Sequence, residues 1–137
     1  MVKQRIHIHS VDWTVNIFYD TNPPNTDEIL DVLWSLECPQ RYMYKAERLL
    51  RSGRDNEGLT YSNPHKRESI VVIGHTSSLF EMCNSIMHEL DHLQVAICRA
   101  YGLRTDGEDA AYLMGDITET IARNAYRMMK KLFLYLI

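Results

Sequence analysis

The chain has few of the residues that build a cross-linked or membrane-embedded scaffold. It holds three cysteines, Cys38, Cys83 and Cys98, and no two of them form a C-x-x-C pair. An odd, low cysteine count excludes a disulfide framework and a zinc ribbon. The longest apolar run, residues 132–137, is far too short to span a bilayer, and residues 1–10 lack the apolar core of a signal peptide. We therefore expect a cytoplasmic protein with no membrane partner.

A strong charge of either sign is also missing. The 18 acidic and 15 basic residues give a formal net charge of −3, whereas a general nucleic-acid binder is usually basic. We therefore expect no nucleic-acid partner. The length of 137 residues suits one domain, and no repeat, low-complexity segment or linker divides the chain. We expect a single domain over residues 1–137, while the sequence leaves its oligomeric state open.

The hydrophobic pattern places strands first and helices last. Alternating apolar and β-branched residues predict strands within 4–20, 58–62 and 68–74. Helical spacing predicts helices over about 26–38, 42–51, 79–101 and from 105 or 106 toward 135. This order predicts an α+β fold with one core, in which a small twisted sheet packs against the third helix. The C-terminal helix is expected to return and close the functional site.

The motif that carries chemistry is His-Glu-Leu-Asp-His at residues 88–92. It matches H-E-x-x-H within the helix predicted over 79–101. Residues four apart share one helical face, so His88 and His92 can reach one ion, and zinc accepts neutral imidazole nitrogens readily. Glu89 lies about 100° further round the helix. In that position it can take a proton from a zinc-bound water.

Helix geometry predicts that both histidines are exposed. An apolar stripe marks the side that should be buried, and it consists of Leu79, Cys83, Ile86, Leu90, Leu93 and Ile97. His88 and His92 lie about 160° from Leu90 on the helical wheel, so they should not be core residues. A solvated pair of histidines without function is the remaining alternative. The helix should begin after the capping pair Ser78 and Glu81 and end at Gly102.

A two-histidine zinc site needs a third protein ligand and one open position for water. The last helix offers three acidic candidates, Glu108, Asp109 and Glu119. We prefer Glu108, because it follows His92 by 16 residues, enough for a turn and a return to an adjacent helix. Asp109 and Glu119 stay open as alternatives. Thr105-x-x-Glu108 also spells a capping box, which would give Glu108 a purely structural role.

The stretch from about 70 to 120 resembles the small gluzincin-type zinc metallopeptidases, the thermolysin-like class reduced to one domain. The likeness rests on the strand ESIVVIG, the helix with HELDH, a turn, and a helix that opens with an acidic residue. The segment EDAAYLMG also resembles small phage and prophage proteins that carry H-E-x-x-H. The resemblance implies a zincin-like fold and a Zn²⁺-dependent peptidase that acts on a peptide or protein substrate.

The same resemblance implies roles for individual residues. His88, His92 and Glu108 correspond to the three metal ligands, and Glu89 to the general base. The strand over 70–73 would be the cleft edge on which an extended peptide lies by strand addition.

Two further residues are candidates for stabilising the oxyanion of a tetrahedral intermediate. Tyr112 shares a helical face with Glu108, one turn along. His75 lies between the strand over 68–74 and the H-E-x-x-H helix, near the expected mouth of the cleft. For both residues a structural role, or no role, is the alternative.

Two other functions compete with an active peptidase. A zincin-fold binding or structural protein of a phage-like system would retain zinc without turnover. HELDHL also resembles the H-E-x-D-H-L segment of peptide deformylases, which use an upstream cysteine as the third ligand. The closest segment here is Glu37-Cys38-Pro39.

Overall fold

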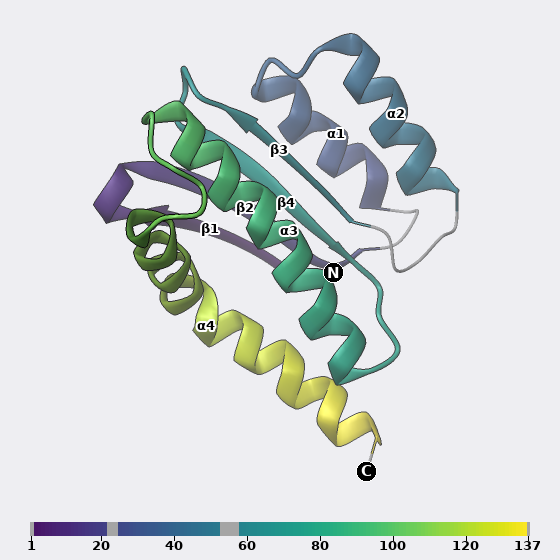
Figure 1. Ribbon diagram of the computed structural model, residues 1–137. Coiled ribbons are helices and arrows are strands. Elements are labelled where there is room, and N and C mark those ends of the chain that lie inside the picture. Colours follow the sequence, from purple (N-terminus) through teal and green to yellow (C-terminus); the bar gives the residue numbers. More distant parts are fainter. Residues whose placement is uncertain (1, 22–24, 53–57, 137) are drawn as a thin grey trace.

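The structure is a computed structural model that describes residues 2–21, 25–52 and 58–136, without the side chains at 123–125, 128, 129 and 131–136. Within these ranges four strands and four α-helices follow one another (Figure 1). The order is β1 (Val2–Ile8), β2 (Trp13–Thr21), α1 (Thr26–Ser35), α2 (Gln40–Arg51), β3 (Leu59–Asn63), β4 (Glu68–Gly74), α3 (Leu79–Ala100) and α4 (Glu108–Leu136), with a short 3₁₀ helix at His9–Val11. The predicted α+β class is confirmed.

The strands form one mixed sheet in the order β1-β2-β4-β3. β2 and β4 are parallel, whereas β1 pairs with β2 and β3 pairs with β4 in antiparallel fashion. The expectation that residues 70–73 form the edge of a cleft is wrong, because β3 covers that side of β4 in a register that joins Leu59 to Val72. β3 is therefore the edge strand beside α3.

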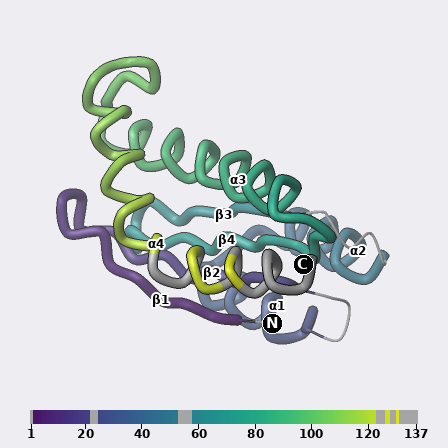
Figure 2. Tube along the Cα trace, turned by 90° about the horizontal axis from the view of Figure 1, so that it is seen from below, coloured from purple at the N-terminus to yellow at the C-terminus, as the bar shows by residue number. Residues whose placement is uncertain are grey.

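The sheet separates two apolar clusters, where the sequence led us to expect one core. On one face, the side chains of Val15, Ile17 and Val71 pack with α3 and α4. On the other face, Phe18 and Ile70 pack with α1, α2 and the Leu59 side chain. Figure 2 shows α3 on one side of the strands and α1 on the other. Near-continuous burial of β2 and β4 follows from this double cover, as is typical of strands between two helical layers.

Helix α3 begins and ends where the sequence predicts. The Ser78 hydroxyl accepts a hydrogen bond from the Glu81 backbone N–H, which caps the first turn. Gly102 has φ +68°, a left-handed conformation that favours glycine after a helix. Beyond it, the buried Gln94 side chain donates to the Thr105 carbonyl and holds the turn into α4. None of the described helices is long and apolar enough to cross a bilayer.

Candidate metal centre and its cavity

The two histidines of the H-E-x-x-H motif converge on the exposed face of α3. Their Nε2 atoms lie 3.3 Å apart, and their rings meet edge to face at 76°. The opposite face of the helix carries Ile86, Leu90 and Leu93, all buried against the sheet and α4. The predicted exposure of the pair is confirmed, since burying the apolar stripe turns both imidazoles outward.

The pair has the chemistry and the spacing of two zinc ligands. Zinc–nitrogen bonds of about 2.0–2.1 Å in a tetrahedron separate two ligand nitrogens by about 3.3–3.4 Å, close to the 3.3 Å between the two Nε2 atoms. Neither Nδ1 atom has a hydrogen-bond partner among the described residues, so the structure supplies no side chain that orients the rings from behind. The two histidines therefore fit the metal as ligands, with little outer support.

Glu89 is the buried member of the motif, with 6 % of its surface exposed. Its Oε2 atom accepts a hydrogen bond of 2.6 Å from the Thr60 hydroxyl, which is also 3.2 Å from the Glu89 carbonyl oxygen. Oε1 has no such partner among the described residues, and no described buried side-chain oxygen is left unpaired. Oε1 is thus open to the cavity, while Oε2 is fixed by β3.

Gly58 leaves the room that the Glu89 carboxylate occupies. A Cβ atom at this position would lie 2.4 Å from the Val72 carbonyl oxygen and 3.1 Å from Glu89 Oε1. The first distance is shorter than real Cβ contacts allow, so any side chain would push the start of β3 away from β4. The glycine is required here by close approach of the backbone.

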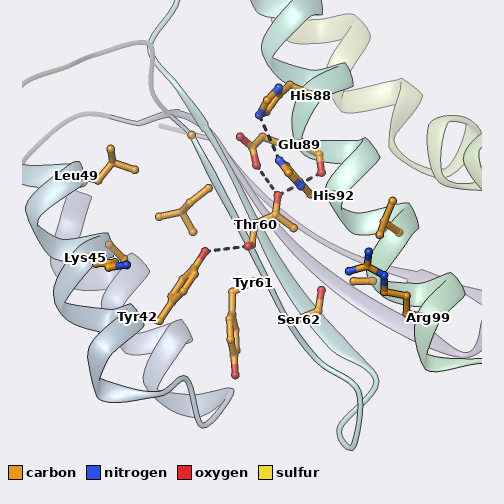
Figure 3. A pocket seen from close by; sticks show the side chains of 15 residues that line it. Tyr42, Lys45, Leu49, Thr60, Tyr61, Ser62, His88, Glu89, His92 and Arg99 are labelled. Atoms are coloured by element: carbon orange, nitrogen blue, oxygen red, sulfur yellow. Dashed lines mark hydrogen bonds between the residues drawn. The ribbon is translucent and has the colours of Figure 1, made fainter. Parts of the chain in front are cut away.

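A cavity of about 610 Å³ opens in front of the motif, between α2, β3 and α3 (Figure 3). Its walls include the three motif residues on one side and Tyr42 and Lys45 of α2 on the other. This size falls within the range of small-molecule and peptide side-chain pockets. The motif therefore lines a walled hollow that is open to solvent.

Tyr42 closes the α2 side of the cavity by binding the edge strand. Its hydroxyl donates to the Thr60 carbonyl oxygen at 2.9 Å, and its ring packs against Tyr61 at 5.2 Å between centroids. Burial raises the pKa of the Tyr42 phenol to about 12, with smaller contributions from Cys38, Glu89 and Tyr61. The phenol therefore stays protonated at neutral pH and acts as a donor.

The structure does not bring the three acidic candidates of α4 to the histidines. Glu108 lines a separate hollow at the turn between α3 and α4, together with Asp109. Asp109 lies near Cys98, whose thiol pKa is raised by burial and then by this carboxylate. Glu119 is exposed further along α4. Across the described ranges, no three His, Cys, Asp or Glu side chains gather into a metal-ligating group.

The geometric reason lies in how the two helices pack. The apolar stripe of α4, with Ala110, Ile117 and Ile121, is buried in the same cluster as the stripe of α3. Faces opposite two packed stripes point away from each other. The residues that the wheel placed opposite the α4 stripe therefore face solvent, and no α4 residue whose side chain is described lines the cavity. The expectation that the C-terminal helix closes the site is wrong.

The two oxyanion candidates also lie outside the cavity. Tyr112 is 72 % exposed on α4. His75 follows β4, and its Nδ1 atom lies 2.6 Å from Asp20 Oδ1 at the end of β2. Cys38 is buried in the cluster with α1 and α2 and does not line the cavity. The described residues thus do not supply the cysteine ligand that deformylases use.

The residues that sequence reasoning missed come from α2, β3 and the end of α3. Thr60, Gly58 and Tyr42 contact the motif or its edge strand, and Lys45 and Arg99 line the same cavity. Alternation along residues 58–62 could have signalled that Thr60 and Ser62 share one face. Nothing in the sequence indicated that this face meets α3 at Glu89.

Comparisons with protein-family models, with curated proteins and with solved structures find no match to this chain.

Proposed function

We propose that the chain is a zinc-dependent hydrolase with a zincin-like fold that cleaves amide bonds in peptides or proteins. The observation that carries this proposal is the convergence of the His88 and His92 Nε2 atoms at 3.3 Å on a cavity that also holds Glu89. A zincin-like arrangement is further supported by the position of α3, which lies beside the edge strand β3. The free thiols of Cys38, Cys83 and Cys98 fit a reducing, cytoplasmic setting.

His88 and His92 would hold the ion through their Nε2 atoms. When bound, zinc supplies Lewis acidity and makes water easier to deprotonate at neutral pH. Glu89 would take a proton from water in the cavity and pass it to the leaving amine, a role supported by its Oε1 atom, which has no hydrogen-bond partner among the described residues. Thr60 holds the other oxygen and so fixes the direction of the carboxylate.

A second candidate is a zinc-binding protein without turnover, as in a phage-like structural or binding role. The observation that favours it is that the described residues supply two histidines and no third ligand. Such a protein would bind zinc through the same pair, and removal of the metal would lower its melting temperature. It would hydrolyse no peptide.

Peptide hydrolysis by the wild type and by Glu89→Gln separates the two candidate functions. We expect wild-type protein, purified without chelators or a His-tag, to contain zinc and to cleave members of a fluorogenic peptide library. Glu89→Gln should retain the metal and lose at least about 100-fold in kcat, as is typical when a general base is removed. Metal content by mass spectrometry and cleavage by fluorescence are the two measurements. Zinc without cleavage in the wild type would favour the binding protein, and no zinc would overturn both.

A further inference from the structure

The cavity beside the motif carries unpaired positive charge. Lys45 on α2 and Arg99 on α3 line it from opposite walls, as Figure 3 shows. Neither side chain forms an ion pair with any described residue. The described lining of the cavity holds one acidic residue, Glu89, so Lys45 and Arg99 leave it with an excess of positive charge. The charge in this space therefore favours a negatively charged occupant.

Arg99 lies about two helical turns after His92 on α3. It follows His92 by seven residues on one helix, which corresponds to about 10 Å along the axis at 1.5 Å per residue. An extended peptide advances about 3.3 Å per residue. If the scissile bond of a bound peptide lies beside His92, the peptide residue that reaches Arg99 is therefore the one about three positions from that bond.

The edge strand gives such a peptide a path between these two points. β3 has a strand neighbour on one side, β4, among the described strands. Thr60 and Ser62 of β3 line the cavity between the histidines and Arg99 (Figure 3). The Thr60 carbonyl oxygen already accepts from the Tyr42 hydroxyl, so a peptide on this path would lie against the Thr60 and Ser62 side chains and would not add to β3 as a further strand at this point.

We propose that this cavity binds extended acidic peptides, with Arg99 binding an Asp or Glu side chain about three residues from the bond beside His92 and Lys45 adding positive charge from the opposite wall. The inference deepens the proposed hydrolase and rests on it for the meaning of the scissile bond. The binding preference itself rests on the charge and spacing of residues outside the motif.

Binding by fluorescence anisotropy tests this preference without any need for turnover. The protein is the full chain carrying Glu89→Gln and loaded with zinc, and the probes are labelled ten-residue peptides that differ by one Glu or Gln three positions from the central bond, on either side. We expect the Glu peptide to bind about three- to tenfold more tightly than its Gln counterpart at low salt, and the difference to shrink as salt is added.

Three variants on this background locate the recognition. Arg99→Gln should reduce the Glu-over-Gln preference to below about twofold, and Lys45→Gln should reduce it by a smaller factor, because Lys45 acts across the cavity and not by direct contact with the carboxylate. Arg48→Gln removes a similar exposed charge from α2 outside the cavity and should leave the preference unchanged. Equal binding of the two peptides, no binding of either, or an unchanged preference in Arg99→Gln would overturn the inference. Acidic-peptide binding without hydrolysis by the wild type would overturn the proposed enzyme and leave the preference standing.

Discussion

Helices α3 and α4 each carry a polar face opposite an apolar stripe, and the two faces have different surroundings. The α3 face, with His88 and His92, looks across a cavity walled by α2 and β3. The α4 face, with Glu108, Tyr112 and Glu119, is exposed to solvent. Both patterns look alike on a helical wheel. What distinguishes them is a second wall, which only the tertiary structure provides.

The comparison also shows why two packed helices rarely share a site built from their outward faces. The stripes of α3 and α4 meet in one apolar cluster with the sheet. Any residue placed opposite its own stripe then points away from the partner helix. A third protein ligand for a metal held by the two histidines would have to come from an element that faces the cavity, such as α2 or β3, and not from the far side of α4.

Metal binding is where the two helices should differ most. His92→Ala removes one of the two converging nitrogens, and we expect zinc affinity to fall on the order of 100-fold or more, since a single imidazole cannot hold the ion. Glu108→Ala changes an exposed residue in another hollow and should leave zinc affinity within about twofold. Competition with a zinc-sensitive dye measures both affinities.

Loss of zinc in Glu108→Ala would contradict the contrast between α3 and α4. If Glu108→Ala lost the metal as His92→Ala does, α4 would have to approach the histidines in the zinc-bound protein, and the contrast between the two helices would disappear. His75→Ala is a suitable control, since that imidazole lies beside Asp20 and outside the cavity.

The sequence predicted the motif residues and the helix that carries them, because local rules govern both. Residue spacing turned His88 and His92 outward, and the Ser78 hydroxyl accepts from Glu81 N–H, the cap that marks the helix start. The edge strand and the α2 wall could not be predicted in this way. Strand order depends on which side of β4 receives β3, and β4 alone reads as a continuous apolar run in either case.

Replacement of glycine by alanine should have opposite effects on stability beside the cavity, at Gly58, and on α4, at Gly115. Gly58→Ala places a Cβ atom against the Val72 carbonyl oxygen and near Glu89, so we expect a loss of roughly 1–3 kcal/mol in unfolding free energy. Gly115 lies within α4 with no atom near its added Cβ. Gly115→Ala should stabilise the protein by roughly 0.5–1 kcal/mol through helix propensity. Urea denaturation followed by circular dichroism measures both changes, and a neutral Gly58→Ala would contradict the close approach of the start of β3 to β4.

The contact between β3 and α3 can be tested by a smaller change at Thr60. Thr60→Val keeps the shape of the side chain and removes the hydroxyl that holds Glu89 Oε2. If the chain is the proposed hydrolase, the less firmly directed Glu89 carboxylate should lower kcat about tenfold, equivalent to about 1.4 kcal/mol, with KM within about twofold. Thr60→Ser restores the hydroxyl and should recover most of the rate. Steady-state kinetics on one cleaved peptide, with zinc content measured in parallel, distinguishes positioning of Glu89 from general damage. If both variants lost rate equally, the methyl group of Thr60 and its packing would matter more than the hydrogen bond, and the second wall would act on the motif by shape alone.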